Sequence, residues 1–312
     1  MTINQRLPFP RVVRIEPAAK CNLTCSHCPT GTVDMERGLM NDVVFERVLA
    51  EIKENIASVK VIVLYHGGEP LLNKKFYSMA TEIRALSSDF YIKTVTNGMS
   101  LNERNISKFL ECDFNEVEIS LDGLSPAESQ EIRVKSDSRK IIRNIKQLIR
   151  ARDKISSSLK ISISTTQFLR ARADIEYPEK LIPVTPDWLT DELPDTVNFK
   201  PYLAMRWPHM NVDKQYELVY VNGEDRNYCD HPVNTITIRY NGDIVPCCYD
   251  LTSQLLMGNI MHKSLLGIFN GDKYRSLRSS IEEKKYKPLC MNCNLVRPQV
   301  YLVKPEIPIS TN

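Results

Sequence analysis

The stretch Cys21-Asn22-Leu23-Thr24-Cys25-Ser26-His27-Cys28 places three thiols in eight residues, with the spacing C-x3-C-x2-C. In a chain without an evident secretory segment, clustered cysteines indicate metal ligands or catalytic groups before disulfides. Three thiolates can hold three irons of a [4Fe–4S] cluster, which leaves the fourth iron open to a small chelating ligand. A structural zinc site is the alternative, because His27 would complete a Cys3His set.

The composition is that of an ordinary water-soluble globular protein. The chain has 312 residues, of which 42% are hydrophobic and 25% are charged. Its net charge of +3 is too small to indicate binding to nucleic acid or to a membrane surface. Residues 1–11 lack the apolar core of a signal peptide, and no apolar run approaches the roughly 18 residues of a membrane span. We therefore expect a cytoplasmic protein with no nucleic-acid or membrane partner.

A second motif, His66-Gly67-Gly68-Glu69-Pro70, follows the apolar run Val61–Tyr65. The β-branched residues of this run predict a strand. Two glycines at its end present bare backbone to a ligand, and Glu69 adds a carboxylate. His66, beside Gly67, is interpreted as an ordinary side chain at the end of the strand.

The two motifs together, each placed after a predicted strand, resemble the radical S-adenosylmethionine (SAM) superfamily. The resemblance implies that Cys21, Cys25 and Cys28 hold a [4Fe–4S] cluster whose open iron is chelated by SAM. It also implies that the Gly67-Gly68-Glu69 strand end holds the SAM amino group. A side chain at Gly68 would then crowd the bound methionine.

Polar side chains end two further predicted strands. Asn97 lies in a Thr-Asn-Gly sequence, and Ser120 and Asp122 lie in Ser-Leu-Asp-Gly. Both sequences are also typical of turns. The resemblance implies that Ser120 or Asp122 reaches the SAM ribose, with Asn97 at a neighbouring strand end, and that Arg133 meets the SAM carboxylate. A solvated helix charge is the alternative for Arg133.

Apolar strands alternate with amphipathic helices along the first two thirds of the chain. The expected strands are 12–16, 61–65, 90–95, 117–121, 159–163 and 197–203. The expected helices are 41–56, 76–86, 102–110 and 141–149. This alternation predicts right-handed β-α units around a parallel sheet, and Pro201 favours an edge position for the sixth strand. The fold class is therefore α/β: a partial (β/α)6 radical SAM barrel over residues 12–205, after an N-terminal arm at 1–11.

Five cysteines lie in the last third of the chain: Cys229, Cys247, Cys248, Cys290 and Cys293. The segment between Cys229 and Cys247 predicts a β-hairpin with Asn241-Gly242 at its turn, which brings these two thiols together at the open end. The C-x2-C pair of Cys290 and Cys293 completes a set of four. Such a set is also a zinc-ribbon pattern.

Taken with the first motif, this segment resembles the shortened SPASM extension known as the Twitch domain. The resemblance implies a second, auxiliary [4Fe–4S] cluster. Its ligands would be Cys229, Cys247, Cys290 and Cys293. We expect this small hairpin-and-helix domain at 229–300, after a linker at 206–228 and before a tail at 301–312. The stretch 205–210 either faces the substrate pocket or belongs to that linker.

The resemblance also implies a reaction class. An electron from a donor such as flavodoxin or ferredoxin would reach SAM through the reduced cluster. SAM would then split into methionine and a 5′-deoxyadenosyl radical, which removes a substrate hydrogen atom. Twitch-bearing aminocyclitol dehydrogenases pass an electron on to the auxiliary cluster and form a ketone, so a small carbohydrate-like alcohol is the expected substrate. Peptide or protein maturation, epimerisation and a non-enzymatic metal-binding scaffold are the alternatives.

Cys248 and Asp250 are the candidate catalytic residues. Adjacent residues of an extended segment point to opposite sides, so Cys247 and Cys248 are not expected to bind the same cluster. In an epimerase, the Cys248 thiol would donate a hydrogen atom to a substrate radical, with Asp250 as a base. The alternatives are that Cys248 packs as a buried thiol or replaces Cys247 as ligand, and that Asp250 is a surface charge.

Overall fold

The computed structural model describes residues 6–205, 207, 216–221, 223–298 and 300–304. A curved nine-stranded sheet forms its frame, in the order β10-β9-β8-β1-β2-β3-β4-β5-β6. Six neighbouring parallel strands make up the larger part: β1 (Val12–Ile15), β2 (Val61–Leu64), β3 (Tyr91–Thr96), β4 (Glu116–Ser120), β5 (Lys160–Gln167) and β6 (Asn198–Leu203). Pro201 lies in β6 at the edge of the sheet. The predicted α/β fold with a parallel sheet is confirmed.

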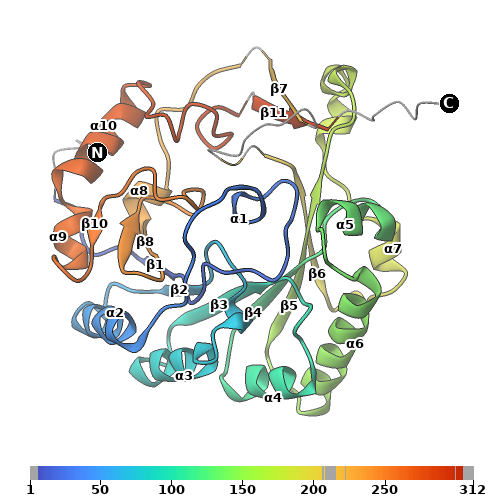
Figure 1. The fold of residues 1–312 in the computed structure, drawn as a ribbon, viewed down its shortest axis with the longest axis horizontal. Helices are drawn as coiled ribbons and strands as arrows, with labels where there is room; N and C mark the ends of the chain where they lie inside the picture. Colours follow the sequence, from blue (N-terminus) through green and yellow to red (C-terminus); the bar gives the residue numbers. More distant parts are fainter. Residues whose placement is uncertain (1–5, 206, 208–215, 222, 299, 305–312) are drawn as a thin grey trace.

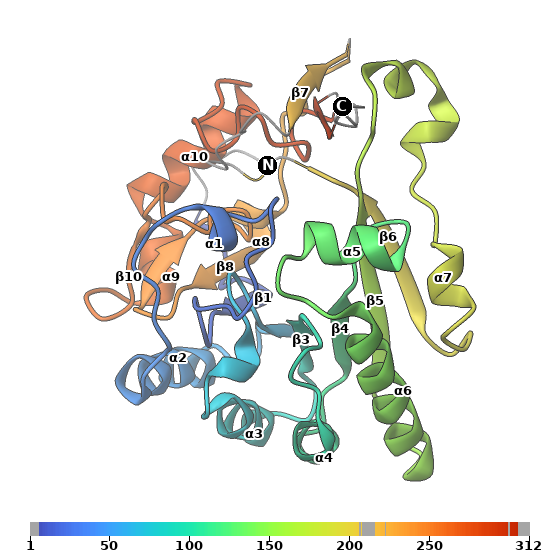
Figure 2. The same ribbon diagram turned by 45° about the vertical axis from the view of Figure 1, so that its right-hand side comes forward.

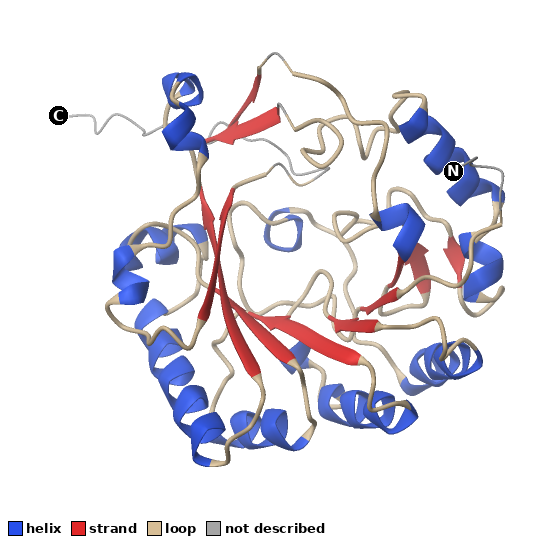
Figure 3. Cartoon of the chain, turned by 180° about the vertical axis from the view of Figure 1, so that it is seen from behind, coloured by secondary structure: helices blue, strands red, loops and turns tan. Residues whose placement is uncertain are grey.

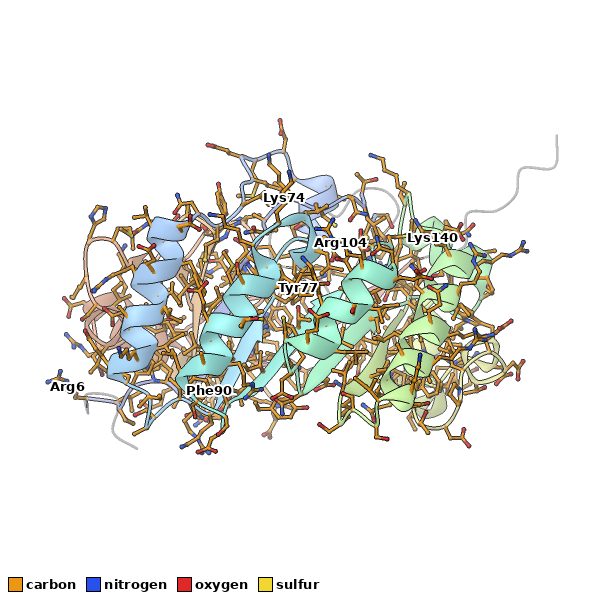
Figure 4. All side chains as sticks on the ribbon, turned by 90° about the horizontal axis from the view of Figure 1, so that it is seen from below. Arg6, Lys74, Tyr77, Phe90, Arg104 and Lys140 are labelled. Carbon is orange, nitrogen blue, oxygen red and sulfur yellow. The ribbon has the colours of Figure 1, made fainter. Side chains whose placement is uncertain are left out.

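Four helices cover the outer side of this sheet: α2 (Asp42–Glu54), α3 (Phe76–Leu86), α4 (Glu103–Glu111) and α6 (Ser138–Lys154). Figures 1 and 3 show them outside the strands, and Figure 4 shows them side by side, with Tyr77 on α3 and Arg104 on α4. The Tyr77 hydroxyl donates to the Asn105 carbonyl at 3.1 Å and so joins these two helices. Asn41 and Asn102 cap α2 and α4 with their side chains.

The two faces of the sheet differ in polarity. Residues paired across neighbouring strands share a face, and successive residues alternate between faces. The outer face is largely apolar and packs with the helices into the hydrophobic core through Val13, Ile15, Ile62, Leu64, Ile92, Val117, Ile119, Ile161 and Ile163. The inner face carries most of the polar strand residues, so the interior of the partial barrel is hydrophilic.

Several shorter elements lie outside the predicted pattern. They are α1 (Pro29–Thr32), α5 (Pro126–Ile132), α7 (Asp187–Thr190) and the 3-10 turns η1 (Pro70–Leu72), η2 (Arg172–Glu176) and η3 (Pro178–Leu181). β7 (Glu217–Tyr220) and β11 (Val300–Val303) pair as a separate antiparallel ribbon. Most of the stretch 205–210, expected near the pocket or in a linker, lies outside the described residues.

The C-terminal elements are α8 (His231–Asn234), β8 (Thr235–Ile238), β9 (Asp243–Val245), β10 (Gly258–Asn259), α9 (Leu265–Phe269) and α10 (Asp272–Glu282). β8 and β9 form the predicted hairpin, in which Gly242 alone of the two turn residues has a positive φ, of 86°. β8 also pairs in parallel with β1. The hairpin therefore extends the barrel sheet, on the opposite side from α6 and α7 (Figure 2). The sequence did not predict this long-range pairing.

Among the described residues, no helix is both long and apolar enough to cross a membrane.

Candidate functional site

The cysteine loop leaves the carboxyl end of β1 and is held on two sides by backbone hydrogen bonds. After β2, the Glu69 amide donates to the Lys20 carbonyl at 2.8 Å. At the end of α5, the Ile132 carbonyl accepts from the Ser26 amide at 2.9 Å. The loop is therefore fixed between the Gly-Gly-Glu strand end and the segment that leads to Arg133.

The three thiols of this loop differ in exposure: Cys25 is buried, whereas Cys21 and Cys28 are partly exposed. Burial raises the pKa of Cys21 and raises that of Cys25 to about 12. A buried thiol becomes a thiolate when a strong positive charge, such as a metal centre, lies beside it. The donor set therefore fits a thiolate-bound metal cluster.

Gly68 permits a close approach between the two sequence motifs. A Cβ atom at this position would lie 2.4 Å from the carbonyl oxygens of Ala18 and Lys20. Backbone atoms cannot give way as a flexible side chain can, so only glycine fits. The sequence predicts that a side chain at Gly68 would crowd the bound methionine. In the structure, a side chain at Gly68 would first meet the backbone of the segment that leads into the cysteine loop.

Glu69 is buried and holds the carboxyl end of β3. One of its carboxylate oxygens accepts from the Thr96 hydroxyl at 2.7 Å and the Leu71 amide at 3.2 Å, and the other accepts from the Asn97 amide at 2.8 Å. The Asn97 side chain in turn donates to the Asn22 side chain in the cysteine loop at 2.8 Å. Glu69 and Asn97 thus meet beside the loop although they follow different strands.

Asp122 and Arg133 form a largely buried ion pair, with 2.7 Å between Oδ2 and Nη1. The other Asp122 oxygen accepts from the Thr166 amide at 3.0 Å. Burial raises the pKa of Asp122, but the charges of Arg133 and His27 and the hydrogen bonds from Arg133 and Thr166 together leave the pKa below its ordinary value. Among the described residues, Arg133 Nε is buried without a hydrogen-bond partner. Arg133 is therefore a largely buried cation and not a solvated helix charge.

His27 and Ser120 lie nearby with other contacts. His27 Nε2 lies 3.8 Å from Asp122 Oδ2, and its ring meets Phe168 edge-on, with 5.6 Å between the centroids. These contacts do not favour the Cys3His zinc alternative. The Ser120 hydroxyl accepts from the Ser164 hydroxyl at 3.4 Å, at the carboxyl end of β4.

The second group of cysteines lines a cavity with about 400 Å³ of empty space, which is continuous with solvent. Four thiols take part: Cys229, Cys247, Cys290 and Cys293. Apolar side chains such as Leu277 and Ile281 form much of the remaining wall. Burial raises the pKa of Cys290 to about 12 and that of Cys293 to about 11. Four thiols in one largely apolar cavity fit a [4Fe–4S] cluster. In the described part of the chain, no three His, Cys, Asp or Glu residues are arranged to hold a single metal ion.

Cys248 is not among the lining residues of this cavity, and its sulfur lies 3.1 Å from His231 Nε2. Burial raises the pKa of Cys248, but the Arg14 charge, the hydrogen bond and charge of His231 and a backbone hydrogen bond together lower it. Asp250 is fully buried, and its two oxygens accept from the Gln254 amide at 2.8 Å and the Leu255 amide at 2.9 Å. These contacts give Asp250 a structural role in the turn after Cys248, and it is not a surface charge.

Glu16 is a buried site residue that sequence reasoning missed. It directly follows β1 and contacts the residues after β2 and after β8. The available signal was a carboxylate between an apolar strand and the cysteine motif, a position where a charge needs buried partners.

Replacing Gly68 with alanine is expected to lower the iron content of the first loop, because the added Cβ would push residues 18–20 away from β2. Iron per chain after anaerobic reconstitution, together with the Tm of the holoprotein, measures this effect. Gly258→Ala is the matched control, because its Cβ would meet only side-chain atoms of Ile268, at 3.1 Å. Full iron and an unchanged Tm in Gly68→Ala would contradict the close approach.

Comparisons with known families match both halves of the site. Residues 15–162 match the radical SAM superfamily, and residues 229–294 match the SPASM family, described as an iron–sulfur cluster-binding domain. Among curated relatives, the S-adenosyl-L-methionine-dependent 2-deoxy-scyllo-inosamine dehydrogenase of Niallia circulans is 33% identical over 73 residues, or 23% of this chain and 29% of the relative. The GTP 3′,8-cyclase of Aliarcobacter butzleri is 27% identical over 139 residues, or 43% of this chain and 42% of the relative. The matched stretches thus span less than half of each of these relatives.

Solved structures share the fold over most of the chain. BtrN in complex with AdoMet and 2-DOIA has a TM-score of 0.59 and 17% identity, and the match covers 92% of this chain and 94% of BtrN. SuiB of Streptococcus suis bound to S-adenosylmethionine also has a TM-score of 0.59 and 17% identity, and the match covers 87% of this chain and 68% of SuiB. At this identity the likeness concerns the fold. The chain therefore contains a radical SAM domain followed by an iron–sulfur cluster-binding SPASM domain.

Proposed function

We propose that this protein is a radical SAM enzyme that oxidises a small hydroxylated substrate with SAM and two [4Fe–4S] clusters. Cys21, Cys25 and Cys28 would hold the first cluster. The auxiliary cluster would be held by Cys229, Cys247, Cys290 and Cys293. The observation that carries this proposal is the cavity lined by these last four cysteines, in a chain that also presents a cysteine loop against a Gly-Gly-Glu strand end.

When bound, SAM and the first cluster would supply a 5′-deoxyadenosyl radical, with methionine as the other product, and this radical would remove a substrate hydrogen atom. Loss of the hydroxyl proton to solvent and of one electron to the auxiliary cluster would then give a ketone. The chain would fix SAM. Glu69 makes three hydrogen bonds, but a carboxylate has about four acceptor positions, so it could also accept from the SAM amino group. The unpartnered Nε of Arg133 would meet the SAM carboxylate while Nη1 stays on Asp122.

The inner face of the barrel favours a hydrophilic substrate. In closed β/α barrels, bulky branched side chains fill this space. Here the inner face of β3 to β6 is polar and carries Lys93, Glu118, Ser120, Ser162, Ser164 and Lys200. Lys200 pairs with Glu118 at 2.8 Å, so the charges are partly matched within the wall. Such a surface suits hydroxyl groups, and the similarity to a 2-deoxy-scyllo-inosamine dehydrogenase supports an alcohol of this kind.

Epimerisation is the second candidate, because the Cys248 thiol lies outside the proposed ligand set and beside His231. Asp250 would be a poor base for this reaction, because it is fully buried and its carboxylate holds the turn through the Gln254 and Leu255 amides. Similarity to the peptide-binding SuiB and to GTP 3′,8-cyclases adds a peptide or a nucleotide as alternative substrates. An electron donor such as flavodoxin or ferredoxin and a cytoplasmic location belong to the same proposal.

The metal content tests the ligand sets. We expect about eight irons per chain after anaerobic reconstitution. Replacing Cys21, Cys25 and Cys28 together by alanine should leave about four irons, and replacing the four cavity cysteines should also leave about four. Cys112→Ala is the control, because this thiol lies in the core near Thr81 and should not affect iron. Zinc at the second group, with iron only at the first, would contradict the auxiliary cluster.

The Cys248→Ala variant separates oxidation from epimerisation. A thiol donor adds a solvent-derived hydrogen atom and leaves the oxidation level of the substrate unchanged, whereas a dehydrogenase adds none and releases a product two electrons more oxidised. We expect oxidation, with activity and iron retained in Cys248→Ala. Mass spectrometry of products formed in heavy water gives the measurement. Deuterium in an isomeric product, absent with Cys248→Ala, would overturn the dehydrogenase proposal.

A further inference from the structure

Glu16 is a fully buried carboxylate that follows β1 and joins the two neighbouring strand ends. Its Oε1 atom accepts from the Gly67 amide at 3.1 Å and lies 3.1 Å from His66 Nδ1. Gly67 and His66 directly follow β2, next to Gly68. One carboxylate oxygen of Glu16 is therefore hydrogen-bonded to the strand end where SAM is proposed to bind.

The second carboxylate oxygen of Glu16 is hydrogen-bonded to the C-terminal part of the chain. Oε2 accepts from Arg239 Nε at 3.2 Å and from the Tyr240 amide at 3.1 Å, directly after β8. Arg239 also donates to the Ser253 hydroxyl at 2.6 Å, beyond the hairpin. The Glu16 amide completes the junction by donating to the Ile238 carbonyl at 2.9 Å. Glu16 thus contacts both partners of β1 in the sheet.

The space around Gly67 shows that the same two regions lie close together. A Cβ atom at Gly67 would lie 2.9 Å from Glu16 Oε1 and 3.2 Å from Leu251 Cδ2. Leu251 is buried and follows the proposed ligand Cys247 and the adjacent Cys248. The proposed SAM-binding strand end therefore leaves no room for a side chain between itself, Glu16 and the segment that carries the proposed ligand Cys247.

We propose that Glu16 is a positioning residue that couples the geometry of the SAM-binding strand end to that of the auxiliary-cluster domain. A buried carboxylate with all its donors in place resists displacement, because any shift leaves a charged or polar group unpaired in a low-dielectric environment. A movement of the β8 end would therefore be transmitted through Glu16 to His66 and Gly67. This coupling rests on the proposed function, since it assumes that SAM binds at Gly67–Glu69.

The test is the affinity of the reconstituted holoprotein for SAM, followed by equilibrium dialysis and by the change that SAM causes in the EPR spectrum of the reduced cluster. Glu16→Gln removes the negative charge and replaces one carboxylate oxygen by an NH2 group. That group cannot accept from the two donors that faced the oxygen, so SAM binding should weaken by about tenfold. Arg239→Met should weaken it by a similar factor, although Arg239 contacts Glu16 and not the β2 end. The double variant should be little weaker than either single variant, as for residues that act through one interaction.

Glu51→Gln is the matched control for a purely structural effect. Glu51 is also buried, and it joins the first part of the chain to the C-terminal part by accepting from Arg47 at 2.6 Å and from the Leu265 amide at 3.1 Å. It lies near the C-terminal end of α2, which a β-α unit places at the amino ends of the strands, away from the proposed SAM site. Its SAM affinity should stay within about twofold of that of the wild type.

Each outcome bears on a separate claim. A wild-type holoprotein that does not bind SAM would refute the proposed function itself. If the wild type binds SAM and Glu16→Gln, with full iron, binds it equally well, the coupling is wrong. If only Glu16→Gln binds SAM more weakly and Arg239→Met has unchanged affinity, Glu16 acts on Gly67 alone and the proposed coupling to the C-terminal part is wrong. Should Glu16→Gln fail to fold, Arg239→Lys decides instead: it keeps the charge but loses the directed bonds, and unchanged SAM affinity would overturn the coupling.

Discussion

The hydrogen bond from the Glu69 amide to the Lys20 carbonyl joins the two motifs on which the rest of the site depends. It forms because Gly68 has no side chain, which lets the strand end lie directly against residues 18–20. The Glu69 carboxylate then holds the end of β3 through Thr96 and Asn97. Backbone contact at one residue thus brings a cysteine loop, a carboxylate and a third strand end together, and the buried Glu69 carboxylate has the partners that a low-dielectric interior requires.

The pairing of β8 with β1 extends this frame to the second group of cysteines. β1 lies between β2, which ends at the Gly-Gly-Glu motif, and β8, which continues through the hairpin to Cys247. The loop with Cys21, Cys25 and Cys28 and the segment with Cys247 therefore both follow strands of one continuous sheet. A shared sheet suits two proposed clusters, of which one would reduce SAM and the other would accept an electron from the substrate, because it holds the reacting groups at fixed positions.

Much of the barrel could be predicted from local patterns. The six parallel strands and the helices α2, α3, α4 and α6 follow from alternating apolar runs, and the caps at Asn41 and Asn102 follow from residue type. The β8–β1 pairing could not be predicted, since it joins residues far apart in sequence and no local periodicity encodes the partner of a strand. The short helix α5 was missed because its few turns give too little periodicity.

The candidate site was predictable in residue type but not in contacts. Gly68, Glu69 and Asn97 are recognisable from their motifs, yet the obstacle at Gly68 is a backbone segment that only the folded chain brings near. Asp250 has the residue type of a base, but its carboxylate is used by the turn that follows it. Glu16 carries no motif of its own, and its importance depends on partners contributed by β2 and β8.

Formation of 5′-deoxyadenosine is the most direct test of the proposed chemistry. The anaerobically reconstituted protein is reduced in the presence of SAM, and the products are separated by chromatography and then identified and quantified by mass spectrometry. Radical SAM chemistry predicts that 5′-deoxyadenosine and methionine form in equal amounts, and only when the protein is reduced. Intact SAM after reduction of a protein that holds its full iron would contradict the assignment of this site to SAM cleavage.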